Sequence, residues 1–364
     1  FRVALPLARP AIIAGLALVL METLADYGTV AYFGVPTLST GIYRTWFGLG
    51  DAMAAAQLAG VLLLAMVVLL TLERRARKER RISVASARAA APLPLGRGPG
   101  LLLAAALWLP VLLGFILPAL QLLVWSLPRW RDLAEPGFLG LLGTSLLIAL
   151  CTALAATGLG LLLIWARRLR GDRPRRLAAG LAGFGYAVPG TVLAVGVVLV
   201  LASLDRGLND LLASVGLPQP GLLFSGTLFA VVFACTVRFL TIPIQGLDAG
   251  LQNLSPNLDN AARSLGTASL PMLRRVHLPL LRVPLATSAL LVFVDTLKEL
   301  PAALVLRPFN TNTLAVRAFE LASDERLADA ALPALTILLA GVAPVILLTR
   351  SIRNPHQESP HADH

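Results

Sequence analysis

Residues 260–266, NAARSLG, are followed after a gap of nine residues by VHLP at residues 276–279. Pro256, shortly before this stretch, is typical of a helix start, and Gly266 can take the left-handed conformation that ends a helix. A second amphipathic piece follows, and Pro279 is expected to break it before the next apolar run. The pattern predicts a helix–turn–helix that can dock a soluble partner. The alternative is an ordinary connecting loop.

Long apolar runs lie on both sides of this loop. Of the 364 residues, 57% are hydrophobic and only 14% are charged, whereas soluble domains carry about 25% charged residues. This composition excludes a soluble enzyme and a disordered chain. Two cysteines, Cys151 and Cys235, lie in separate apolar runs and exclude a disulfide scaffold. We therefore predict an all-α polytopic membrane protein.

The apolar runs are continuous and do not alternate with period two, which favours membrane-spanning helices over a β-barrel. Each is long enough to cross about 30 Å of hydrocarbon. We predict about eight spans, over residues 11–33, 52–72, 101–127, 139–166, 177–203, 222–246, 284–306 and 330–349.

Clusters of basic residues predict the orientation of the chain. Residues 74–81 and 167–176 are rich in Arg and Lys, so by the positive-inside rule they face the cytoplasm, together with Arg2, Arg9, the 247–283 loop and the C-terminal tail. The formal charge of +11 could also suggest nucleic-acid binding. No aromatic platform or recognition helix accompanies the basic clusters, so contact with anionic lipid is favoured and no nucleic-acid partner is expected.

Two parts of the chain repeat each other at an offset of 273 residues. RVALPLAR at residues 2–9 corresponds to RVHLPLLR at residues 275–282. The same offset matches acid to acid, pairing Glu22 with Asp295 and Asp26 with Glu299. Both copies run from a cytoplasmic loop into an outward-going helix, which predicts a parallel repeat with a pathway between two similar halves. The second copy has about six spans, so about four further helices are expected before Phe1.

The domain organisation follows from the repeat and from the composition of residues 82–100. These residues are rich in Ala, Pro and Gly and suit a flexible connector. We expect residues 1–72 to be a remnant of the first half, 73–100 a basic cytoplasmic linker, 101–349 the second half with its loop at 247–283, and 350–364 a cytoplasmic tail.

Ala261-Ala262, Gly266 and Leu278-Pro279 resemble, in identity and spacing, the EAA loop of permease subunits of binding-protein-dependent ABC importers. Asn260 stands where that family usually has Glu, and Asp259, about 100° away on a helix, is a candidate substitute. The resemblance implies an ABC importer type I permease fold. It also implies a loop that couples to a cytoplasmic ABC ATPase dimer through Asp259, Asn260, Ala261, Ala262, Gly266, Leu278 and Pro279, with Leu5 and Pro6 left from the first half's loop.

Residues 298–301, KELP, 306–310, LRPFN, and 313–317, TLAVR, resemble the ferric-iron permeases with two fused halves. This resemblance implies a multi-pass inner-membrane subunit of an ATP-driven importer of ferric iron. A periplasmic binding protein is then expected to dock on the outer loops 33–50, 204–220 and 307–328. Permeases for thiamine, phosphonate and polyamine share much of the loop and remain alternatives.

Acidic residues inside predicted spans mark a candidate pathway. Each one costs roughly 2.5–3.5 kcal/mol on insertion scales, so exposure to lipid is disfavoured. Acids four residues apart share one helix face, which predicts two acid pairs facing each other and lining a route for a cation. The alternative is that they cap helix ends or bond between helices. Arg238 is expected to extend to the inner membrane surface instead. The predicted pathway residues are Glu22, Asp26, Asp295, Lys298 and Glu299.

No catalytic residue, bound cofactor or metal is predicted for this chain. His277 lies in the loop and the other histidines in the tail, so no spacing resembles a closed metal site. No Gly-rich phosphate loop is present, which assigns ATP and Mg²⁺ to the partner ATPase. The predicted spans hold no histidine, which argues against an intramembrane enzyme. An ion-coupled secondary transporter, with the acids as coupling sites, is the remaining alternative.

Overall fold

The computed structural model describes residues 4–78, 96–169, 172–252 and 254–353. These residues form helices joined by turns, and no β-strand occurs among them. The prediction of an all-α membrane protein is confirmed. Most of the predicted linker and tail, residues 79–95 and 354–364, lies outside the described residues.

The elements follow one another in four groups. The first is α1 (Ala4–Ala25), α2 (Gly28–Tyr32), α3 (Leu38–Tyr43), η1 (Arg44–Gly48) and α4 (Ala52–Lys78). The second is α5 (Arg97–Val111), η2 (Leu112–Ile116), α6 (Leu117–Ser126), η3 (Leu127–Ala134) and α7 (Pro136–Leu169). The third is α8 (Arg173–Ala182), η4 (Gly185–Ala187), α9 (Gly190–Ser214), α10 (Leu228–Phe239) and α11 (Thr241–Gln252). The last is α12 (Pro256–Ser264), α13 (Ser269–Met272), η5 (Leu273–His277), α14 (Leu278–Leu280), α15 (Arg282–Leu297), α16 (Pro301–Leu306), α17 (Leu314–Ser323) and α18 (Leu327–Arg353).

Within the described ranges, five helices are long and apolar enough to cross a membrane, and up to seven spans result if each of two bent pairs is one span. The five are Ala52–Glu73, Arg97–Ala134, Pro136–Leu169, Gly190–Ser214 and Leu327–Ile346. The bent pairs are Leu228–Phe239 with Thr241–Gln252, at 42°, and Ser269–Leu280 with Arg282–Leu297, at 76°.

Four of the predicted spans, 52–72, 101–127, 139–166 and 330–349, each lie within or closely match one of these helices. Three others are broken. The 11–33 span is divided where α1 ends at Ala25, the 222–246 span at the bend between α10 and α11, and the 284–306 span where α15 ends at Leu297. These breaks place polar backbone and charged side chains inside the bundle.

The predicted span over residues 177–203 is wrong. The chain there forms the short helix α8, a turn, and then α9, which starts only at Gly190. Gly185 packs directly against the carbonyl of Val237, where a Cβ atom would collide. Pro189 then caps the start of α9. Close packing at this turn therefore divides a stretch of chain whose apolar composition suggests a single helix.

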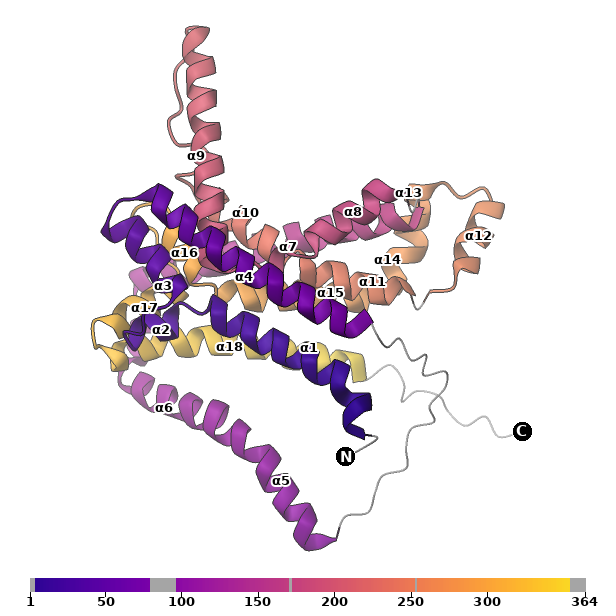
Figure 1. Cartoon of the computed structure of the whole chain (residues 1–364), viewed down its shortest axis with the longest axis horizontal. Coiled ribbons are helices and arrows are strands. Elements are labelled where there is room, and N and C mark those ends of the chain that lie inside the picture. Colours follow the sequence, from indigo (N-terminus) through magenta and orange to yellow (C-terminus); the bar gives the residue numbers. More distant parts are fainter. Residues whose placement is uncertain (1–3, 79–95, 170–171, 253, 354–364) are drawn as a thin grey trace.

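The second half of α9 projects from the body of the molecule (Figure 1). The polar residues in this half of α9 suggest a loop, but the segment is helical and the side chain of Asp205 is buried. The Asp205 carboxylate accepts backbone N–H groups of Leu223, Phe224 and Ser225 at 3.1, 2.9 and 2.8 Å. The returning chain thus folds onto α9, and the predicted outer loop at 204–220 is largely helical.

The internal repeat is visible in the order of elements. α1, α2, α3 and α4 correspond to α15, α16, α17 and α18; α2 begins at Gly28 and α16 at Pro301, which preserves the offset found in the sequence. α4 and α18 contain 27 residues each. In Figure 1, α1 and α15 both run away from the end that carries α12 to α14, which we call the loop end, toward the end that carries α17, the far end.

The core lies where α7, α9, α10, α15 and α16 meet. Many of its buried residues are alanines, and such small side chains let helix backbones approach closely. They are Ala153, Ala156, Ala194, Ala230, Ala234 and Ala302. Gly160 of α7 also packs against Pro243 of α11, with room for no side chain. α7 is thus held firmly against α11 along its middle.

Candidate functional site

A cavity of about 360 Å³ lies at the breaks in both repeats. We call it the acid cavity. Its charged and phenolic lining residues are Glu22, Asp26, Tyr27, Tyr186, Arg238, Asp295, Lys298 and Glu299. The structure thus brings together all five residues predicted for the pathway, from segments more than 250 residues apart in sequence.

Helix ends position the acids. Glu22 and Asp295 lie in the last turns of α1 and α15, and Asp26 and Glu299 follow those helices. Asp26 Oδ1 accepts the N–H of Thr29 at 3.4 Å, and Glu299 Oε1 accepts the N–H of Ala302 at 3.2 Å. In each repeat, therefore, the second acid of the pair binds a free N–H at the start of the next short helix, where a negative charge is favoured.

Two ion pairs lie in the acid cavity. Lys298 Nζ is 2.9 Å from Asp295 Oδ1, and Arg238 Nη1 is 2.9 Å from Glu299 Oε1. The prediction that Arg238 extends to the membrane surface is wrong, because its side chain is only 11% exposed. α10 ends inside the bundle at the bend before α11, so the end of this helix is not at the surface.

Among the residues that the structure describes, the remaining two acids of the cavity have no basic partner. Tyr186 Oη donates a hydrogen bond to Glu22 Oε1 at 2.8 Å and links η4 to α1. Within the described parts of the chain, no cation forms an ion pair with Glu22 or Asp26. Four acids against two bases leave the acid cavity with a formal charge of −2. Such a cavity attracts cations.

The loop predicted from the sequence forms as expected around Gly266. α12 ends at Ser264, and Gly266 takes a φ of 75°. The N–H groups of Gly266 and Thr267 donate to the carbonyls of Arg263 and Ala262 at 2.9 and 3.0 Å, which is a Schellman motif. The chain then bends by 76° at Leu281, two residues beyond the predicted break at Pro279.

The residues predicted for coupling are not equally accessible. Asn260, Ala261, Gly266 and Pro279 are exposed, and Ala262 and Leu278 are half-buried. Leu265, which the sequence did not single out, is 85% exposed beside Gly266. Leu5 and Pro6 lie near the start of α1, and their side chains are outside the described residues.

Asp259 is turned into the structure and does not take the place of Asn260 on the outer surface. Its Oδ2 accepts the Nε–H of Arg168 at 2.7 Å, and its Oδ1 lies 2.9 Å from His277 Nε2. Burial raises the pKa of Asp259, but the hydrogen bonds and positive charge of Arg168 and His277 outweigh it and hold the pKa below 3.8. Sequence reasoning missed this cluster because the basic run around Arg168 already had an explanation as a topology signal.

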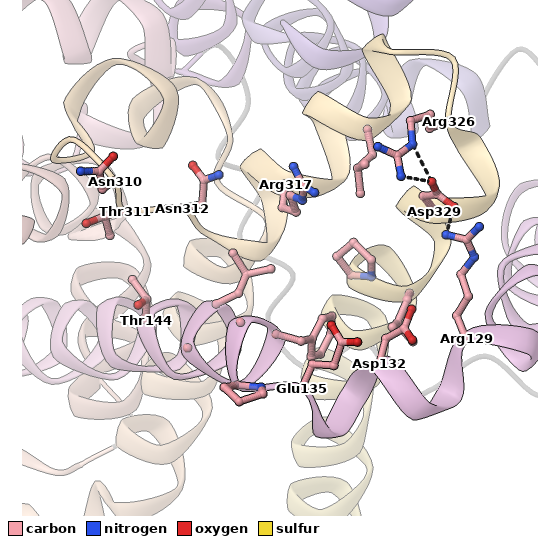
Figure 2. Close-up of a pocket in the computed structure, with 18 residues that line it drawn as sticks. Arg129, Asp132, Glu135, Thr144, Asn310, Thr311, Asn312, Arg317, Arg326 and Asp329 are labelled. Carbon is pink, nitrogen blue, oxygen red and sulfur yellow. Dashed lines mark hydrogen bonds and ion pairs between the residues drawn. The ribbon is translucent and has the colours of Figure 1, made fainter.

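A second, larger pocket of about 770 Å³ opens at the far end. Figure 2 shows Asp329 between Arg129 and Arg326, paired with both, and Asn310, Thr311 and Asn312 near Thr144. The adjoining loop is held by Glu320, which accepts hydrogen bonds from Arg307 and Asn312 at 3.0 and 3.2 Å. This loop presents Phe309, which is 96% exposed. The far end therefore offers a polar pocket, held by ion pairs, beside an exposed aromatic side chain.

Comparison with known families agrees with this architecture. The profile of the family described as "Binding-protein-dependent transport system inner membrane component" matches residues 156–354. The chain belongs to this family. It is accordingly a permease component of a binding-protein-dependent transport system.

The curated relatives of this permease are named for different transported substrates. The Fe(3+)-transport system permease protein FbpB 2 of Haemophilus influenzae is 26% identical over 353 residues, which is 95% of this chain and 66% of the relative. The chain thus spans just under two thirds of that relative's length. The putative 2-aminoethylphosphonate transport system permease protein PhnV of Salmonella typhimurium is 27% identical over 249 residues, 64% of this chain and 87% of the relative.

Solved structures support the fold. A chain of the bacterial alginate ABC transporter, in complex with an alginate pentasaccharide-bound periplasmic protein, aligns with a TM-score of 0.52 and 15% identity. The alignment covers 70% of this permease and 91% of that chain. At this identity the likeness concerns the fold alone.

Proposed function

We propose that this permease carries ferric iron across the bacterial inner membrane, driven by a cytoplasmic ATPase dimer and supplied by a periplasmic binding protein. The loop end, with α12, is the cytoplasmic end, in agreement with the basic clusters near residues 74–81 and 167–176. The far end, with Phe309 and the polar pocket beside it, faces the periplasm and receives the binding protein.

The observation that carries this proposal is the formal charge of −2 in the acid cavity. A cationic cargo lowers the electrostatic energy of Glu22 and Asp26, whereas an anion raises it. Ferric iron, thiamine and polyamines are cations, and the phosphonate group is an anion. The ferric-iron relative aligned over 95% of the chain adds weight to iron.

The two parts of the chain contribute to one pathway. Residues 1–72 supply Glu22 and Asp26, and residues 101–349 supply Asp295, Lys298 and Glu299. Residues 73–100 then act as the linker between the halves and 350–364 as a cytoplasmic tail. Closure of the ATPase dimer moves α12, and the halves open the acid cavity toward the cytoplasm.

The cavity passes its cargo without chelating it. In the described part of the chain, no group of three or more His, Cys, Asp or Glu side chains is placed to hold a metal ion. Selection of the cargo therefore rests with the binding protein, and the permease contributes a favourable field. ATP and Mg²⁺ bind the partner ATPase.

Uptake of labelled ferric iron into proteoliposomes containing permease, ATPase and binding protein tests the proposal. Glu22→Gln removes a charge but keeps an oxygen that can accept the Tyr186 hydrogen bond, and Asp26→Asn removes the second charge. Loss of about 1–2 kcal/mol of cation stabilisation per charge predicts a roughly five- to thirtyfold fall in uptake for each variant. Asp172→Asn, an exposed acid just before α8 that lies outside the acid cavity and the expected docking loops, is the matched control and retains full uptake.

Competition separates the remaining cargo classes. Excess thiamine, spermidine or 2-aminoethylphosphonate is added with the corresponding binding protein in the same system. The iron assignment is rejected if cells that lack the gene take up as much iron as wild-type cells. It is also rejected if the reconstituted system takes up phosphonate in preference to iron. Uptake that continues without the ATPase favours an ion-coupled secondary transporter.

A further inference from the structure

Arg168 at the loop end of α7 binds three separate parts of the chain at once. Its Nε donates to Asp259 of α12 at 2.7 Å, its Nη1 to the carbonyl of Leu251 at 2.7 Å and its Nη2 to the carbonyl of Leu254 at 3.4 Å. The side chain is only 16% exposed. One guanidinium therefore fixes the last turn of α11, the turn after it, and α12 to α7.

Asp259 extends this arrangement to the other arm of the loop. Its second oxygen lies 2.9 Å from His277 Nε2 on η5, and His277 is 1% exposed. We call Arg168, Asp259 and His277 the Arg168 cluster. One oxygen of Asp259 binds Arg168 of α7 and the other faces His277 of η5, so this acid holds α12 to both elements rather than facing a partner protein.

The burial of the Arg168 cluster makes it sensitive to single substitutions. Removing one member of a buried, hydrogen-bonded charge pair leaves an uncompensated charge, which is strongly destabilising. The neighbouring residue Arg167 pairs with Asp248 of α11, but these side chains are 31% and 26% exposed. This half-buried pair joins α7 to α11 and not to α12, so Arg167 provides a matched control on the same helix.

α7 connects the Arg168 cluster to the far end. The buried Oγ of Ser145 accepts the N–H of Leu314 at the start of α17, at 2.8 Å. Ser145 and Arg168 are about 35 Å apart along the helix at 1.5 Å per residue. Between them, Gly160 is in close contact with Pro243 of α11. α7 is thus bonded to α12 near one end and to α17 toward the other.

We propose that the Arg168 cluster makes α7 a second route of coupling, parallel to the direct path along the chain from α14 into α15. Arg168 acts as a positioning residue that converts movement of α12 into movement of α7, and through Ser145 into movement of α17 at the far end. The role in transport rests on the proposed function, whereas the attachment of α12 to α7 does not.

Amide hydrogen exchange of the permease alone in nanodiscs tests the attachment. Arg168→Gln is expected to accelerate exchange in α12 at least tenfold, while exchange in α10 and α16 stays unchanged and shows that the core remains folded. Arg168→Lys keeps a charge for Asp259 but cannot reach both carbonyls, so an intermediate acceleration is expected. Arg167→Gln leaves α12 at the wild-type rate. Unchanged exchange in Arg168→Gln overturns the attachment.

The ratio of cargo imported to ATP hydrolysed, measured in proteoliposomes, tests the coupling. Arg168→Gln and Asp259→Asn are each expected to lower this ratio at least tenfold, and the double variant should be no worse than the more severe single one. Ser145→Ala should lower the ratio without altering exchange in α12. Independent, multiplying effects of the two single variants, or a normal ratio despite faster exchange, overturn the second route. Absence of ATP-driven uptake in the wild type instead rejects the proposed function and leaves the exchange result standing.

Discussion

At the scale of single residues, the acid cavity depends on a glycine that packs against a buried ion pair. Gly190, the first residue of α9, lies against the Arg238–Glu299 ion pair, and a Cβ atom there would collide with Arg238 Nη1 and lie 2.6 Å from Glu299 Oε1. The pair is nearly buried, so neither side chain can move into water. The absence of a side chain at this position allows the ion pair to form beneath α9.

Gly190→Ala is expected to destabilise the protein by about 1–3 kcal/mol, the usual cost of forcing extra volume into a packed site. Gly196 lies on the same helix with open space around its Cα, so Gly196→Ala should be neutral or stabilising by up to about 1 kcal/mol. Thermal unfolding of the purified permeases in one detergent compares the two variants. Equal midpoints for both would show that the ion pair does not restrict Gly190.

At the scale of elements, the ends of helices decide what the site contains. α1 and α15 stop inside the bundle, so the acids near their ends meet in one cavity. α12 ends in a Schellman motif at Gly266, which turns the chain back toward η5 and brings His277 to Asp259. The loop is therefore a closed unit fastened to α7.

The attachment of α12 to α7 should weaken as the pH falls below the ordinary pKa of an aspartate. The folded protein holds the pKa of Asp259 below its ordinary value of 3.8 through Arg168 and His277, despite burial. The carboxylate thus stabilises the fold at pH above 3.8, and this contribution is lost as the pH falls through the lower folded pKa. Protonation of Asp259 itself therefore contributes no change between about pH 5 and pH 7.

A spin label on Asn260→Cys, in a background without Cys151 and Cys235, measures this effect. Its mobility should stay constant down to pH 3.8 and rise only below it. The same label combined with Asp259→Asn should be mobile at every pH. Mobility that rises near neutral pH would contradict the assignment of the effect to Asp259.

At the scale of the whole molecule, the proposed orientation places the loop end and the far end on opposite sides of the membrane. Leu265 beside Gly266 is 85% exposed, and Phe309 at the far end is 96% exposed. In intact cells, a membrane-impermeant thiol reagent should label Phe309→Cys and not Leu265→Cys. After the membrane is opened, both should react. Labelling of Leu265→Cys in intact cells would place the loop on the outside and reject docking to a cytoplasmic ATPase.

Local patterns were sufficient to predict part of this permease. Apolar length predicted four of the eight expected spans as single helices, and glycine conformation predicted the end of α12 at Gly266. These features depend on residues within one or two helical turns. The expectation that Glu22 and Asp26 share one helix face is wrong, because α1 ends at Ala25 and Asp26 lies beyond it. The repeat offset added the expectation that the acids of both copies meet, and the acid cavity contains them all.

The amino-acid sequence alone thus determined the fold class, the loop and the candidate acids, because each is written in a local periodicity or a spacing. Only the tertiary structure decided the partners of the charges. Glu299 pairs with Arg238, 61 residues away, and Asp259 with Arg168, 91 residues away. Which charges meet depends on where helices break and how they pack, and a buried charge takes the partner that the assembled bundle places beside it.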